Sequence, residues 1–316
     1  MPFPREQGFD VEGDTQSGDI FQRAAILDAL ADLRAFDPRL DALVERESQY
    51  LIDARGREHP GGWSYFPGLR ELPPDADDLA QIMQALIRNG RENDVIAYCA
   101  EPLAVLLDEC SERPGVFETW IVPRARDARY ERQRWWIANA WGAGPDAEVI
   151  ANLLYALTLH APEQYADVIR GGMQYVVDQQ NREGVWSASW YHGPFYPTYV
   201  ACRCIASGSG DAAALDRARS AVLRAQRSDG GWGFGNTSDA LSTAFALLTL
   251  PRSEAAAKYA IAYLTETQES DGGWAAVPWI KMELGRAEGM VRHVLSYGSR
   301  TITCAYVLRA LATAYR

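Results

Sequence analysis

A seven-residue phrase that begins with Gln and ends with Trp occurs three times in the second half of the chain. It reads QNREGVW at 180–186, QRSDGGW at 226–232 and QESDGGW at 268–274, so the tryptophans fall 46 and 42 residues apart. Repeats of that length with helical segments between them indicate a solenoid or a closed ring of helical hairpins. GGWSYF at 61–66 looks like a further degenerate copy, and PGVFETW at 114–120 is a weaker one.

The residues of the phrase predict a structural role. A helix can end at the Gln, and Asp-Gly-Gly then forms a tight turn of the kind that glycine permits. The Trp can pack back over the helix end, while the Gln amide bonds the exposed backbone groups of a neighbouring turn. We therefore expect these Gln and Trp side chains to join ring segments rather than to take part in catalysis.

Apolar residues recur at three- and four-residue steps through most of the chain, which is the periodicity of helices. No region alternates with period two for long enough to predict a strand with assurance. The sequence therefore predicts an all-α fold, with helices at 18–33, 39–52, 77–87, 146–159, 165–180, 214–226, 239–250, 255–268 and 301–315.

Composition excludes several classes of partner. The 316 residues are 47% hydrophobic, enough for a substantial core, and carry a formal net charge of −11, which argues against nucleic acid or anionic lipid as a partner. No apolar run is long enough to cross a bilayer, and the first residues lack the features of a secretion signal. We expect a cytoplasmic protein with a flexible segment at 1–16 and five reduced, buried cysteines, because these are odd in number and scattered.

PPDADDLA at 73–80 places Asp75, Asp77 and Asp78 directly behind two prolines. Taken alone, the stretch favours an ordinary helix start. Prolines suit the turn before a helix, and Asp accepts hydrogen bonds from the free N–H groups of the first turn. Its charge also meets the positive end of the helix dipole. The alternative interpretation is that the three carboxyl groups carry out acid chemistry.

Together, these motifs resemble the squalene-hopene cyclase and class II diterpene cyclase family. QxxDGGW is similar to that family's QW motif, DADD to its DxDD motif, and GGW-SYF precedes the acidic motif in the family's order. The resemblance runs from about Gly61 to the C-terminus. It implies an all-α (α/α)6 double ring, six helices inside and six outside, which we expect to occupy residues 1–316 as a single domain.

The family usually has a second helical domain inserted early in the first, with the substrate cavity between the two, and this sequence has no room for such an insert. Three sources for the missing wall stay open: a second copy of the chain in a homodimer, a separate subunit, or the long irregular stretches 114–145 and 275–298.

The resemblance also implies an activity, the cyclisation of a linear isoprenoid started by protonation of an alkene. It makes Asp77 the proton donor, with Asp75 and Asp78 holding and resupplying the proton. Asn152 matches a helix position where squalene-hopene cyclases carry His and many class II diterpene cyclases carry Asn. That favours a prenyl diphosphate, such as farnesyl or geranylgeranyl diphosphate, over squalene. Protonation requires no metal, although Mg²⁺ could accompany a diphosphate.

Aromatic faces stabilise cations without attacking them, so aromatic residues are candidates for the cavity wall. Tyr65 matches a family position that lines the cavity. Weaker candidates, each of which could equally be core, are Phe66, Trp120, Trp136, Trp141, Trp190, Trp279 and Tyr297.

An anionic headgroup could dock on either of two basic clusters, because guanidinium groups suit phosphate geometry. Five arginines lie within 123–134, and Lys281, Arg286, Arg292 and Arg300 lie near the C-terminus. The alternative for both clusters is a solvated surface with local salt bridges.

Two other functions stay open. Protein prenyltransferase β-subunits share the ring of helical hairpins but hold zinc with Asp, Cys and His, and here the cysteines lack the Asp-x-Cys arrangement and His293 is the one plausible late His. The chain could also be a non-catalytic binding or scaffold ring. An enclosed Asp77 within hydrogen-bond reach of Asn152 would favour the cyclase, and an exposed, unpaired Asp77 would exclude it.

Overall fold

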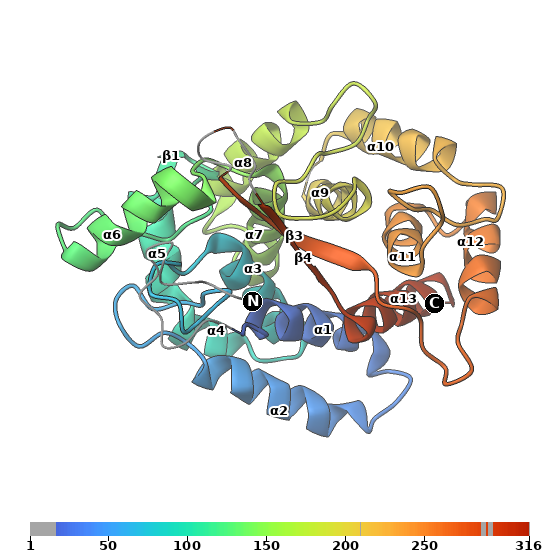
Figure 1. Cartoon of the computed structure of the whole chain (residues 1–316), viewed down its shortest axis with the longest axis horizontal. Coiled ribbons are helices and arrows are strands. Elements are labelled where there is room, and N and C mark those ends of the chain that lie inside the picture. Colours follow the sequence, from blue (N-terminus) through green and yellow to red (C-terminus); the bar gives the residue numbers. More distant parts are fainter. Residues whose placement is uncertain (1–16, 209, 286–288, 290–292, 316) are drawn as a thin grey trace.

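Six helices pack side by side into a closed inner ring (Figure 1). The computed structural model describes residues 17–208, 210–285, 289 and 293–315. Each inner helix contacts the next, and the last returns to the first. In order around the ring they are α1 (Ile20–Leu33), α3 (Ala76–Arg88), α7 (Ala147–His160), α9 (Phe195–Ser207), α11 (Ala240–Thr249) and α13 (Arg300–Tyr315).

The outer layer consists of helices that connect successive inner ones. It contains α2 (Leu40–Asp53), α4 (Glu92–Tyr98) with α5 (Ala100–Glu109), α8 (Ala166–Asp178), α10 (Ala212–Arg224) and α12 (Ala255–Glu266). The outer layer has a gap where the ring closes, because the described residues supply no outer helix between α12, the last outer helix, and α2, the first. The expected all-α double ring is confirmed, although the described residues supply five outer positions where six were expected. The expectation of a flexible segment at 1–16 lies outside the described residues.

Burial separates the two layers. The inner helix α11, ALSTAFALLT, buries nearly every side chain, whereas the outer helix α8 buries Ile169, Gly172 and Val176. A helix enclosed on all sides must be apolar or small all round, and a covering helix needs one apolar stripe. Among the described residues, no helix is both long and apolar enough to cross a membrane.

The repeated Gln-Trp phrase ties the ring together as expected. The indole N–H groups of Trp186, Trp232 and Trp274 donate to backbone carbonyl oxygens near the end of the preceding outer helix, at 2.6–2.7 Å. Gln226 Nε2 donates across its own turn and to the carbonyl of Ala256 on the next outer helix, both at 2.9 Å. Each turn contains a glycine with positive φ, such as Gly230 at 85°.

The degenerate copy at 61–66 follows the same rule, since the Trp63 indole donates to the carbonyl of Leu51 at 2.6 Å. The suggested copy at 114–120 does not. Its Trp120 indole instead donates to the carbonyl of Gly142 at 2.8 Å. This stretch contains the turn and second strand of a short hairpin, β1 (Ser111–Arg113) and β2 (Val116–Phe117), and does not follow a helix end, so it is not a repeat unit.

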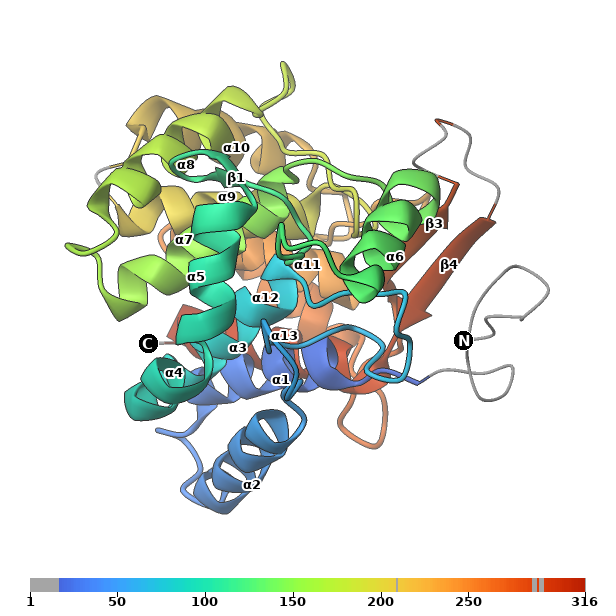
Figure 2. The ribbon, with the colours of Figure 1, turned by 90° about the vertical axis from the view of Figure 1, so that its left-hand side faces the viewer.

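The two stretches expected to be irregular contain regular structure. Residues 114–145 include α6 (Ala128–Trp136) and a π-helix, Ile137–Trp141, and residues 275–298 include the antiparallel strands β3 (Pro278–Leu284) and β4 (His293–Gly298). Figure 2 shows α6 and the β3–β4 hairpin at one end of the ring, and Figure 1 shows the hairpin crossing the ring centre. Both stretches therefore close the same end of the barrel.

Helix α9 was also missed by the sequence patterns. It spans Phe195–Ser207, and its Pro197 lies in the first helical turn, where the missing N–H removes no intrahelical bond. All five cysteines are free thiols, as expected, but only four are buried, and Cys304 is partly exposed.

Candidate active site

The acidic motif is held at its entry by backbone bonds to two distant segments. Asp75 N donates to the carbonyl of Trp63 at 3.1 Å, and Ala76 N to that of Thr119 at 2.7 Å. Asp75 is the N-cap of α3, since its carboxylate accepts from the backbone N–H of Asp78 at 2.8 Å. The capping role is thus confirmed for Asp75, and it directs Asp77 and Asp78 into the ring.

All three carboxyl groups are buried, with Asp78 only 1% exposed. Burial raises the pKa of Asp75 to about 7, with a further contribution from the charge of Asp77. Burial likewise raises the pKa of Asp77 to about 6, and burial with the charge of Asp75 raises the pKa of Asp78 well above its ordinary value. The group can therefore hold protons near neutral pH.

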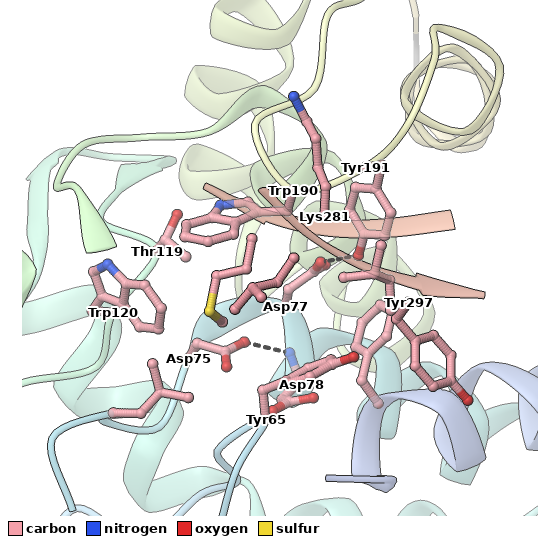
Figure 3. A pocket seen from close by; sticks show the side chains of 15 residues that line it. Tyr65, Asp75, Asp77, Asp78, Thr119, Trp120, Trp190, Tyr191, Lys281 and Tyr297 are labelled. Atoms are coloured by element: carbon pink, nitrogen blue, oxygen red, sulfur yellow. Dashed lines mark hydrogen bonds between the residues drawn. The ribbon is translucent and has the colours of Figure 1, made fainter. Parts of the chain in front are cut away.

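Asp77 is hydrogen-bonded through both oxygens. Asn152 Nδ2 donates to Oδ1 at 2.8 Å, and the Tyr191 hydroxyl donates to Oδ2 through a short bond (Figure 3). Both bonds lower the pKa of Asp77 and so oppose part of the effect of burial. Asp77 is enclosed and paired with Asn152, which is the arrangement that the cyclase interpretation requires.

The three aspartates face a cavity with largely apolar and aromatic walls (Figure 3). Trp120 and Trp190 meet edge to face at 5.5 Å between ring centroids. The β3–β4 hairpin supplies one side, where the Lys281 backbone N–H bonds the carbonyl of Trp190 at 2.9 Å. Besides the aspartates, the lining residues are Phe21, Tyr65, Leu72, Thr119, Trp120, Trp190, Tyr191, Ile280, Lys281, Met282, Leu295 and Tyr297.

Of the expected aromatic wall residues, Tyr65, Trp120, Trp190 and Tyr297 line this cavity. Phe66 is buried behind Tyr65, with ring centroids 4.8 Å apart. Trp141 stacks on Trp136 within the same small core cluster.

Trp279 is also buried, among other aromatic side chains, and its ring centroid lies 5.6 Å from that of Tyr191. Phe66, Trp141 and Trp279 therefore support the wall from behind rather than forming it.

The expected cationic residues are placed less favourably. Arg286 and Arg292 lie outside the described residues. Arg300 pairs with Glu269 at 2.7 Å and with Asp271 in the turn of the last Gln-Trp phrase, away from the cavity lining. Lys281 is the one cationic side chain among the described lining residues, and it pairs with Glu283 at 2.6 Å.

The arginines of 123–134 do not line the acid cavity either. Arg129 pairs with Glu58, and Arg132 pairs with the buried Glu71 at 2.5 Å. For these two side chains the salt-bridge alternative is the one that the structure contains, although the acidic partners differ from those closest in sequence.

Two residues near the acid were not anticipated from sequence. Tyr191 follows the first Gln-Trp phrase by five positions, outside any helical period, so no pattern marks it. Asp146 was expected only within a helix, yet it accepts from the Thr119 hydroxyl and the Trp190 indole, both at 2.8 Å. It thereby fixes two wall residues.

Glu148, in the first turn of α7, holds the loop that carries Tyr191. Its carboxylate accepts from the backbone N–H groups of Ser189, at 2.6 Å, and Trp190, at 3.2 Å. Burial and the charge of Asp146 raise the pKa of Glu148 to about 8. Within the described part of the chain, no group of three or more His, Cys, Asp or Glu side chains is arranged to hold a metal ion.

Comparison with solved structures identifies the same fold. The type II terpene cyclase MstE from Scytonema, in complex with geranylgeranyl dihydroxybenzoate, superposes with a TM-score of 0.71 at 18% identity, covering 94% of this chain and 88% of that one. The ent-copalyl diphosphate synthase from Streptomyces platensis superposes with a TM-score of 0.64 at 22% identity, covering 94% of this chain and 50% of that one.

Sequence comparison identifies the family. Drimenyl diphosphate synthase from Streptomyces showdoensis is 31% identical over 258 residues, which cover 76% of this chain. The chain spans 41% of the length of that synthase. A family profile described as the squalene-hopene cyclase C-terminal domain matches residues 27–279, most of the chain. The chain therefore belongs to the squalene-hopene cyclase C-terminal domain family.

Proposed function

We propose that this protein is a class II terpene cyclase in which Asp77 protonates the terminal alkene of a linear isoprenoid. One observation carries the proposal: Asp77 is enclosed beside an aromatic-lined cavity, hydrogen-bonded to Asn152 and Tyr191, and grouped with two further buried carboxyl groups. The names of the matched synthases agree with this activity.

The proton transfer follows from the geometry. The O–H bond of protonated Asp77 breaks as a C–H bond forms at the alkene, which leaves a tertiary carbocation and the Asp77 carboxylate. Asn152 Nδ2 and the Tyr191 hydroxyl already point at the two carboxylate oxygens, so the charge that develops there meets preorganised donors. Asp75 and Asp78, whose pKa values are also raised, can hold protons for the next turnover.

The cavity wall suits the cation that follows. The faces of Trp120, Trp190, Tyr65 and Tyr297 can stabilise positive charge through their quadrupoles, and they carry no strong nucleophile. Successive alkenes close rings onto the cation, and loss of a proton or capture of water ends the reaction.

For the substrate we favour a prenyl diphosphate, because relatives include drimenyl diphosphate synthase and labda-7,13-dienyl diphosphate synthase. Any diphosphate would be retained, and Mg²⁺ could accompany it. A second candidate is a prenylated arene, since the MstE structure that matches nearly this whole chain holds geranylgeranyl dihydroxybenzoate. The pairing of Lys281 with Glu283 favours this second candidate, because it leaves little free positive charge on the described lining.

We also propose that the chain closes its cavity without a second helical domain. Trp120 and the β3–β4 hairpin come from the two stretches named above as potential sources of the missing wall, and both line the cavity. A homodimer or partner subunit would then be unnecessary for turnover, and a monomer isolated by size-exclusion chromatography should be active.

The test is a substrate screen with matched variants. Purified protein is incubated separately with farnesyl diphosphate, geranylgeranyl diphosphate, squalene and a geranylgeranylated arene, and extracts are analysed by mass spectrometry. We expect a cyclic isomer of one substrate from the wild type and from Asp108→Asn, an exposed carboxylate on α5, and none from Asp77→Asn. Equal product from Asp77→Asn would refute Asp77 as the acid.

A further inference from the structure

A buried cluster of ions links the inner helices close to the acid site. Asp28 on α1 is fully buried and bonds Arg88 on α3 and Arg309 on α13, the latter at 2.6 Å, with Arg203 on α9 at 3.4 Å. Asp32 pairs with Arg88 at 2.6 Å and with Arg309 at 3.0 Å. Three arginines thus meet two aspartates, and the cluster carries one excess positive charge.

Arg203 is the member of the cluster that reaches the partner of the acid. One of its terminal nitrogens donates to Asn152 Oδ1 at 3.1 Å and to Gln84 Oε1 at 2.7 Å. Gln84 in turn donates to the backbone carbonyl of Asn152 at 2.8 Å. The guanidinium also lies over the rings of Tyr155 and Tyr199, so its plane is held on several sides.

This contact fixes which way the Asn152 amide faces. A guanidinium has only N–H donors, so the amide oxygen must point at Arg203 and the NH₂ group must point the other way. There it meets Asp77 Oδ1 and, at 3.2 Å, the Tyr196 hydroxyl. Without Arg203 the amide could turn over and present its oxygen to Asp77, which would disfavour the carboxylate.

Arg203 also places positive charge on the side of Asp77 away from the substrate. It does not line the acid cavity but borders a separate hollow together with Asp32, Arg88 and Arg309. In a poorly solvated interior such a charge acts over several ångströms. It therefore favours the carboxylate that remains after proton transfer without standing between Asp77 and the alkene.

We propose that Arg203 is a positioning residue that makes Asp77 a stronger acid, both by orienting Asn152 and by its charge. The catalytic meaning of this inference rests on the proposed function. The predicted effect of Arg203 on the titration of Asp77 does not depend on it. The charge of Arg203 lowers the pKa of Asp77, in agreement with the geometry. The other titratable or charged groups around Asp77 are Asp75, Asp78, Asp146, Tyr191, Tyr196 and Lys281.

The experiment is an infrared titration of the carboxylic acid band of Asp77, identified by its loss in Asp77→Asn. We expect the midpoint to rise by about one pH unit in Arg203→Gln, as removal of a nearby opposite charge predicts. Arg203→Lys keeps the positive charge, but its single nitrogen cannot replace the two guanidinium nitrogens that contact Asp28 on one side and Gln84 with Asn152 on the other, so its midpoint should rise by less. Arg88→Gln is the matched control, because Arg88 shares the cluster without touching Asn152, and its midpoint should move least.

Circular dichroism verifies the fold of each variant. If folded Arg203→Gln titrates Asp77 with the same midpoint as the wild type, the proposal is overturned. A shift in Arg88→Gln as large as that in Arg203→Gln would also overturn it. If Arg203→Gln does not fold, a wild-type midpoint in Arg203→Lys overturns it instead. Because the titration needs no turnover, it tests Arg203 even if no substrate is cyclised. With an active substrate, the alkaline limb of the kcat profile should shift in the same direction.

Discussion

Replacing Asp77 by Asn should stabilise the protein in neutral solution, by an amount that depends on pH. Burial raises the pKa of Asp77 from 3.8 to about 6, and each unit corresponds to about 1.4 kcal/mol. The folded state therefore disfavours the carboxylate relative to the unfolded chain by about 3 kcal/mol. An Asn at this position carries no charge, and its amide can accept from Asn152 and donate to Tyr191.

The sign of the pH dependence follows from the raised pKa. The stability associated with protonated Asp77 is fully present below pH 4 and is lost as the pH rises through about 6. Urea unfolding, followed by circular dichroism from pH 4 to pH 8, should show similar free energies of unfolding for wild type and Asp77→Asn at pH 4. The variant should become more stable by up to about 3 kcal/mol at pH 8. A difference that stays constant with pH, or one that favours the wild type at pH 8, would refute the reasoning.

Three further changes test separate parts of the structure. Tyr191→Phe removes the hydroxyl that bonds Asp77, so kcat should fall about 10- to 100-fold in steady-state kinetics while the thermal unfolding midpoint changes little. Trp232→Phe removes the indole bond to the carbonyl of Val222 and should lower the free energy of unfolding by about 1 kcal/mol, whereas Trp232→Ala should cost about 3–5 kcal/mol in urea titrations. Asp28→Asn leaves three buried arginines with one aspartate and should cost about 3–5 kcal/mol. Because those arginines lower the pKa of Asp28, the loss of unfolding free energy in Asp28→Asn should shrink as the pH falls below about 4. A loss that is independent of pH would contradict this account of the cluster.

The repeated helix-and-turn unit was predictable because its determinants are local, whereas its closure into a double ring was implied by the family resemblance. The Gln-Trp phrase combines a helix end, a glycine turn and an indole that reaches back ten residues, and each part is visible within one short stretch of sequence. The cap at Asp75 is local in the same way. The pairing of Asp77 with Asn152 was predicted from a family resemblance rather than from periodicity, because the two residues are 75 positions apart.

What escaped prediction depends on contacts between distant segments. The β3–β4 hairpin is short and is held by backbone bonds to the distant 190–192 segment, so its alternation is too brief to predict strands. Tyr191 owes its position to the bonds that the backbone N–H groups of Ser189 and Trp190 donate to the Glu148 carboxylate, which no local pattern encodes. Arg203 lies on α9, and nothing in the sequence around it points to Asp28, which is 175 residues away.

The most direct measurement of the central claim is the fate of the proton. The purified wild-type protein is equilibrated in deuterium oxide and given whichever isoprenoid the screen identifies, and the product is analysed by mass spectrometry and NMR. If Asp77 protonates the terminal alkene, the cyclic product gains one non-exchangeable deuterium at the carbon that receives the proton, and Asp77→Asn yields no such product. A cyclic product without that deuterium, or one formed equally by Asp77→Asn, would contradict the account.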